Sequence, residues 1–247
     1  MVGHELTGIS LLFTRGIAEG RAHLDQGIAL YDPDEHRPLV TRFGKDVRMA
    51  MLMRRAEALW LLGYPDAATD DTNRGLEYVR EIGLAAPLMF ALSIASENHI
   101  LSGNYATAKT LVEEGVALAE EKGTLFWKAV GEMNQGCVFA LTGKASSAIQ
   151  MITSGVTAWR STGSTMWTPM YLSYLAMAHA ELGQFDDAWR CIGEAITAAQ
   201  TTKERCAKPT STESPGKSRC CRRSLRQRRR KGISSVRLRL RTCSSFH

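Results

Sequence analysis

The chain has 247 residues, 44% of them hydrophobic, which is enough for one large domain or two small ones with a substantial core. It has neither the apolar run of about 18 residues that a membrane-spanning helix needs nor a basic N-terminal segment followed by an apolar stretch, so we expect a cytoplasmic protein without such a helix. The net charge of +6 conceals two unequal parts: residues 1–203 carry 17 Lys and Arg against 23 Asp and Glu, and residues 204–247 carry 14 against 2. This asymmetry predicts a folded domain, residues 1–203, and a separate tail, residues 204–247.

The first two predicted helices are separated by the turn at Arg15-Gly16. After this turn Gly20, Leu24 and Gly27 alternate small, large and small side chains, as later units do. The proline-containing segment 32–38 ends the second helix and predicts an inserted loop at which the stack bends. No polar helix precedes the first one to cover its end, so we expect a chain cut from something longer whose open ends favour self-association.

A regular repeat with a constant period follows. Its turns carry Gly63, Gly103, Gly143 and Gly183. An alanine follows each of these glycines by five residues, and a second small residue follows that alanine by seven: Gly75, Gly115, Gly155 and Ala195. A glycine can adopt a positive φ and end one helix, and the later small residues let the next helix approach its neighbour.

These spacings predict helical hairpins at residues 45–62 and 65–82, 86–102 and 105–121, 125–142 and 145–161, and 167–182 and 185–202. A single hairpin cannot bury its apolar face, whereas stacked hairpins can. A fixed period of this length therefore predicts an all-α solenoid of about five hairpins, counting the irregular first one.

The 40-residue pattern resembles long-period tetratricopeptide repeats. Four segments look like the C-terminal repeat region of bacterial adenylate/guanylate cyclase-type predicted ATPases: GRAHLDQ at 20–26, ALWLLGYP at 58–65, ITSG with AWRSTG within 152–163, and AELGQFDDAW at 180–189. The resemblance covers residues 3–203 and implies a right-handed superhelix. It also implies a non-catalytic interaction or sensing module, a fragment of a signalling protein whose cyclase and ATPase domains are absent here.

The tail departs from the repeat at Lys203, which stands where the next glycine is due. Its dense positive charge and scarce apolar residues predict disorder. The mixture of Arg, Ser, Pro and Cys looks like a GC-rich gene read in the wrong frame, so our hypothesis is that residues from about 205 onward are a frameshift product. The alternative function is nonspecific, salt-sensitive nucleic-acid binding through the tail.

No residue pattern predicts catalysis, a cofactor or a metal. The segment 143–146 ends like a phosphate-binding loop, but Val138 occupies the position that such a loop requires to be glycine. Cys137 and Cys191 lie on predicted helices as core thiols. His4-Glu5 does not begin a zinc-binding His-Glu-x-x-His motif, because position 8 is Gly8. His23, His99 and His179 have no Cys or His partner at the spacing typical of zinc sites.

The candidate binding surface is the concave face, which the first helix of each hairpin lines in tetratricopeptide-like stacks. Counting from the repeat glycines places eight residues there: Met53, Glu57, Trp60, Phe90, Glu97, Met133, Met170 and Met177. They predict a methionine-rich groove with two carboxylates for a protein or peptide partner, or a small effector. The alternative interpretation is that the methionines fill the hairpin cores.

Overall fold

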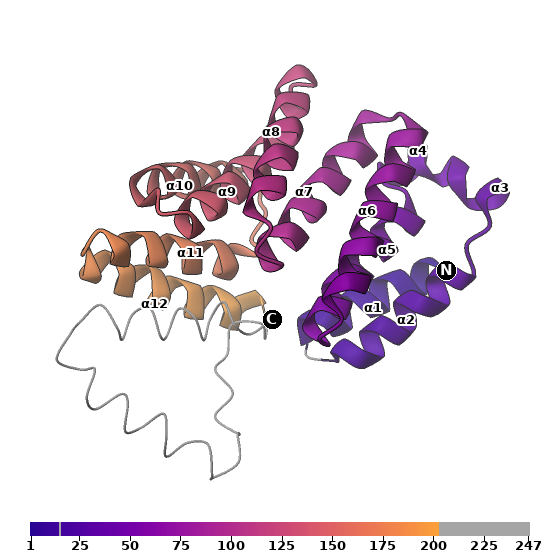
Figure 1. The fold of residues 1–247 in the computed structure, drawn as a ribbon, viewed down its shortest axis with the longest axis horizontal. Coiled ribbons are helices and arrows are strands. Elements are labelled where there is room, and N and C mark those ends of the chain that lie inside the picture. The colour runs from indigo at the N-terminus through magenta and orange to yellow at the C-terminus, as the bar shows by residue number, and fades with distance from the viewer. Residues whose placement is uncertain (15, 203–247) are drawn as a thin grey trace, which may run out of the picture.

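The structure is a computed structural model that describes residues 1–14 and 16–202, so the predicted tail lies outside the described residues. The described part is an all-α solenoid whose hairpins follow one another around an arch, with α7 and α8 near its middle (Figure 1). The paired helices are α1 Val2–Thr14 with α2 Ile17–Ala29, α5 Val47–Leu61 with α6 Pro65–Ile82, α7 Ala85–Leu101 with α8 Tyr105–Glu121, α9 Leu125–Leu141 with α10 Ala145–Ser161, and α11 Thr168–Glu181 with α12 Phe185–Thr202. The predicted fold is confirmed, and the helices of the four regular hairpins begin and end within two residues of their predicted bounds.

The repeat glycines act as the spacing predicts. Those at the turns inside the hairpins have φ between 75° and 87°, the left-handed region in which a side chain is disfavoured. The alanines five residues later are all buried. On the second helices a Cβ at Gly155 would lie 3.1 Å from the carbonyl oxygen of Ala129, so this glycine permits the close approach of α10 and α9.

The insertion between the first two hairpins is helical rather than the expected loop. It forms α3 Pro33–His36, the 3-10 turn η1 Arg37–Leu39 and α4 Val40–Phe43. The Asp32 carboxylate accepts a hydrogen bond from the backbone N–H of Asp34 at 2.9 Å, and Pro33 occupies the first helical turn. Proline ends a helix that precedes it but also favours a helix that starts at it, and the second effect prevails here.

The first helices of successive hairpins lie on one side of the stack. Contacts join α1 to α5, α5 to α7, α7 to α9 and α9 to α11. Among the described helices, the second helices of successive hairpins make no comparable contacts, so the first helices form the inner face of the arch. Cys137 and Cys191 are buried free thiols, as predicted. No helix in the described part of the chain is long and apolar enough to cross a membrane.

Candidate functional site

A buried arginine organises the centre of the inner face. On α5 the Nη1 of Arg54 donates a hydrogen bond to Oε2 of Glu57 at 2.9 Å, because residues three apart share one face of a helix. The same nitrogen lies 3.8 Å from Oε2 of Glu97, which α7 supplies. Only 5% of the Arg54 side chain is exposed, so its charge is balanced by these carboxylates rather than by bulk water.

Two aromatic rings, one from the first described hairpin and one from the last, cover the guanidinium of Arg54. Its Cζ lies 5.2 Å from the ring centre of Trp167, just before α11, and 5.9 Å from that of Phe13, near the end of α1. The Phe13 and Trp167 centroids are 6.4 Å apart. The first and last described hairpins therefore meet on the inner face, in agreement with the approach of the two ends of the arch in Figure 1. We call Phe13, Arg54, Glu57, Glu97 and Trp167 the inner cluster.

The backbone of Trp167 is unusual. Its φ of 61° makes it the one non-glycine residue with a positive φ in residues 1–14 and 16–202. This conformation costs a residue with a side chain on the order of 1–2 kcal/mol. Contacts of the Trp167 ring with Arg54, Phe13 and Trp159 offset the cost, the last at a centroid distance of 5.9 Å. Strained backbone of this kind gathers at functional sites, which makes Trp167 a candidate contact residue.

A hydrogen-bond relay fixes the helices behind the inner cluster. The Tyr171 hydroxyl on α11 donates to Oδ1 of Asn134 on α9 at 2.9 Å. The Nδ2 of Asn134 donates to the Ser96 hydroxyl on α7 at 3.0 Å and to the Ser93 carbonyl at 3.3 Å. This relay joins three first helices across the stack and fixes the position of α7, which carries Glu97.

The environment of Glu97 makes it a titrating group near neutral pH. Burial disfavours its charged form and raises the pKa from its usual 4.5 to about 7, although Arg54 opposes the shift. For Arg54, burial works against the charge, but Glu57 and Glu97 outweigh burial and the pKa stays above its usual value. The inner cluster therefore contains one permanent cation and two carboxyl groups, of which Glu97 is partly protonated at pH 7.

The nucleophilic side chains around the inner cluster remain protonated. Burial raises the pKa of the Cys137 thiol well above its ordinary value, and nearby Glu97 adds to the rise. Burial likewise raises the pKa of the Tyr171 phenol, which fits its role as a hydrogen-bond donor. A buried, protonated thiol is a poor nucleophile, so this cluster is better suited to binding than to covalent chemistry.

The structure disperses the eight residues assigned to the groove. Glu57 and Glu97 lie in the inner cluster. Met53 and Met133 are fully buried within hairpins, against Gly75 and Gly155, and present no surface to a partner. The other four are partly buried. Trp60 lies beside a small hollow between α5, α6 and α7, and the ring of Phe90 packs edge-on against that of Trp127. Met170 and Met177 pack against the hydrophobic core formed mainly by the last two hairpins.

The repeat pattern does not single out Arg54, Trp167 or Phe13. The available signal for Arg54 was its spacing of three residues before Glu57, which places the two opposite charges on one face of a helix. Trp167 occupies the repeat position equivalent to that of Trp127, but Trp127 lies inside α9 and Trp167 precedes α11. Nothing in the repeat pattern predicted that difference, nor the contact with Phe13.

A sequence model of the tetratricopeptide repeat matches residues 169–192, and no curated protein matches the chain. Among solved structures, a Rap protein complexed with competence and sporulation factor superposes with a TM-score of 0.63 at 11% identity, covering 82% of this chain and 55% of that one. The apo form of RapI gives 0.58 at 11% identity, covering 99% and 94%. Aspartyl phosphate phosphatase F from Bacillus subtilis gives 0.57 at 13% identity, covering 82% and 51%.

The chain thus spans about half the length of the Rap protein and of the phosphatase that it matches. Identities this low show a shared fold and no more. Together with the repeat match, they show that the described part of the chain has the fold of a tetratricopeptide-like helical-repeat solenoid.

Proposed function

We propose that the chain is a non-catalytic interaction module that holds a peptide or protein segment against its inner face, where Phe13, Glu97 and Trp167 are the central contacts and the buried Arg54 positions them. The carrying observation is the convergence of Arg54, Glu97 and Trp167 from three hairpins on this face. Arginine and tryptophan are enriched among residues that dominate binding energy at interfaces. Solenoids of this kind use their extended concave surfaces for binding.

The charges suggest what the partner carries. Glu57 takes the close hydrogen bond from Arg54, whereas Glu97 lies 3.8 Å from Arg54 and accepts a long hydrogen bond of 3.5 Å from the Ser93 hydroxyl. A basic side chain or a free amino group of a partner would give Glu97 a charge-assisted hydrogen bond and would favour its ionised form. A segment with one basic residue among apolar residues is thus the expected partner chemistry.

One of the comparisons supports a binding role. One structural neighbour was solved in a complex with competence and sporulation factor, so this fold accommodates a bound partner in that protein. The likeness to the aspartyl phosphate phosphatase, of which this chain covers 51% at 13% identity, extends to the fold and not to the activity of that protein.

We also propose that the chain originates in a cyclase/ATPase-type signalling protein. A small effector is the alternative to a peptide as the bound partner. The origin rests on the segments at residues 20–26, 58–65, 152–163 and 180–189. Sequencing of the DNA that flanks the gene tests it: remnants of a cyclase or ATPase reading frame would support this origin, and unrelated flanking genes would count against it.

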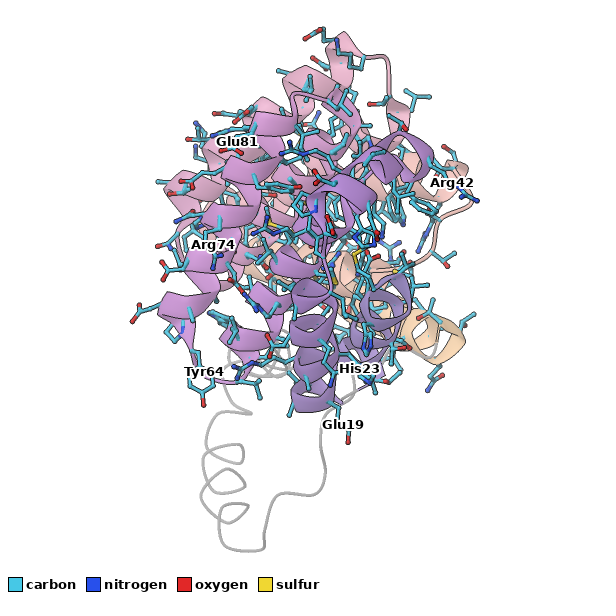
Figure 2. All side chains as sticks on the ribbon, turned by 90° about the vertical axis from the view of Figure 1, so that its right-hand side faces the viewer. Glu19, His23, Arg42, Tyr64, Arg74 and Glu81 are labelled. Atoms are coloured by element: carbon cyan, nitrogen blue, oxygen red, sulfur yellow. The ribbon has the colours of Figure 1, made fainter. Side chains whose placement is uncertain are left out.

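Selection of a displayed peptide library on the full chain tests the binding role. We expect selected peptides to lose at least tenfold in affinity on Arg54→Met and on Glu97→Gln. The matched controls are Arg74→Met and Glu81→Gln, at exposed positions on the outer helix α6 (Figure 2). The assignment of the inner face would be overturned if the control substitutions reduced the affinity, or if none of the four substitutions did. Binding that disappears only on deletion of residues 205–247 would favour the tail instead.

A further inference from the structure

Two histidines that are far apart in sequence meet at the first hairpin. His4 lies in the first turns of α1, and His23 lies in the middle of α2. Their Nδ1 atoms are 3.0 Å apart, their ring centroids are 5.1 Å apart and their planes are inclined by 39°. Both side chains are partly buried, and Figure 2 shows His23 at the surface of α2, one turn from Glu19.

Glycine contacts set the separation of the two helices that carry these rings. A Cβ at Gly20 would lie 2.9 Å from the carbonyl oxygen of Gly8, so α1 and α2 cross at near-backbone contact. A Cβ at Gly27 would lie 3.3 Å from the Cβ of His4. No residue with a side chain fits at the crossing without moving the helices apart. The His4–His23 distance is therefore determined by the packing of the hairpin and not only by the choice of side-chain rotamers.

We propose that His4 and His23 form a chelating site for a divalent transition-metal ion, with Ni²⁺ and Cu²⁺ preferred over Zn²⁺. Nitrogens about 2.0–2.1 Å from an ion lie about 2.9 Å apart when they are adjacent ligands at right angles, and about 3.3–3.4 Å apart in a tetrahedron. The observed 3.0 Å is the length of the hydrogen bond between the rings, and it is close enough to the right-angle separation that small rotations reach the spacing of tetragonal Cu²⁺ and octahedral or square-planar Ni²⁺.

Binding requires a rearrangement of one proton. In the hydrogen-bonded pair of neutral rings, one Nδ1 carries the proton and the other accepts it. Coordination needs both Nδ1 lone pairs, so the donor ring moves its proton to Nε2 through solvent and remains neutral. Small rotations of the two rings then direct both lone pairs to a common point. No electron transfer is involved.

The protein supplies two ligands and water completes the shell. Among residues 1–14 and 16–202, no group of three His, Cys, Asp or Glu side chains converges on one point. The adjacent Glu5 is buried in an ion pair with Lys45, so its carboxylate is already occupied. A bound ion would join α1 to α2, and a ligand that binds only the folded chain stabilises it.

Calorimetric titration of the tag-free, thiol-alkylated full chain with NiCl₂ tests this site. We expect the wild type and the control His36→Gln to bind one Ni²⁺ that His4→Gln and His23→Gln each lose. Zn²⁺ should bind the same site at least several-fold more weakly. Ni²⁺ should also raise the melting temperature of the wild type and the control, and leave that of both histidine variants unchanged.

Two results would overturn the proposal. One is an unchanged Ni²⁺ isotherm in both histidine variants, which would mean that His4 and His23 form a hydrogen-bonded pair only. The other is a melting temperature of the wild type that does not respond to Ni²⁺. Circular dichroism of each variant without metal shows whether it folds. The site needs both histidines, so one folded variant is enough to decide the test.

Discussion

At the scale of single residues, the inner cluster combines charges and rings that are each unfavourable alone. Arg54 is buried, Glu97 has lost most of its hydration, and Trp167 adopts a left-handed backbone conformation. Each is held in place by the others: Arg54 by two carboxylates and two rings, and Trp167 by the cation that it covers. Removal of one member should therefore lower the free energy of unfolding, because the members that remain lose the contacts that offset their unfavourable state.

Glu97→Gln should change how stability depends on pH. The folded state binds the Glu97 proton more tightly than the unfolded state, so the Glu97 contribution is fully present below about pH 4.5 and is lost as the pH rises to about 7. We expect the difference in unfolding free energy between variant and wild type to move in favour of the variant by about 2–3 kcal/mol between pH 5 and pH 8. Urea unfolding at several pH values measures this difference.

The control for this experiment is Glu81→Gln on the exposed side of α6, which should give a nearly constant difference across the same pH range. If the curve of Glu97→Gln runs parallel to that of the wild type, Glu97 titrates in the ordinary range. The account of its burial would then be wrong.

At the scale of helices, small residues decide how closely neighbours pack. Gly155 lies where α10 crosses α9, within reach of the backbone of Met133 and Ala129. Gly193 lies in the middle of α12, and a Cβ there would meet no heavy atom within 4 Å. The two glycines are thus equivalent in helix propensity but opposite in their surroundings.

Gly155→Ala and Gly193→Ala should therefore have effects of opposite sign. We expect Gly155→Ala to lower the free energy of unfolding by about 1–3 kcal/mol, because backbone atoms cannot move aside as a flexible side chain can. Gly193→Ala should raise it by about 0.5–1 kcal/mol, because alanine favours the helix. Urea denaturation of the two variants at one pH gives both values. Destabilisation of equal size at the two positions would contradict this view of the repeat.

The sequence predicted these helices well because their signals are local. A glycine at a left-handed turn and an alanine one turn into the next helix recur in each regular repeat and depend only on neighbouring residues. It was harder to predict which side of each first helix lines the inner face. Helix α7 is buried on nearly every side, so its apolar residues mark no single face. Counting from the turn consequently assigned Met53 and Met133 to a groove, although they are buried within hairpins.

At the scale of the whole molecule, curvature creates the contacts that no local pattern contains. Arg54 and Glu97 come from different hairpins, and Phe13 and Trp167 come from opposite ends of the described stack. The pairing of His4 with His23 likewise depends on how α1 and α2 cross. Sequence spacing alone does not determine these geometries, which explains why the two glutamates were predicted and their partners were not.

The last described hairpin carries apolar side chains outward. Leu182 lies at the end of α11, Trp189 and Ile196 lie two turns apart on α12, and each is between 39% and 46% exposed. We expect the full chain to self-associate through these residues, because burial of large exposed apolar side chains favours association. Ile196→Lys should weaken the association at least tenfold in sedimentation velocity, and Thr197→Lys should not. A monomer at high concentration for both the wild type and Thr197→Lys would contradict this expectation.

The most direct test of the inner face is amide hydrogen exchange of the full chain with and without a peptide selected on it. Our account predicts added protection in the first helices α5, α7 and α11 and around Trp167, and little change in the second helices α6, α8 and α10. It also predicts that Arg54→Met abolishes this protection at the same peptide concentration. Protection centred on the second helices, or equally strong protection in Arg54→Met, would contradict the claim that the inner cluster binds the partner.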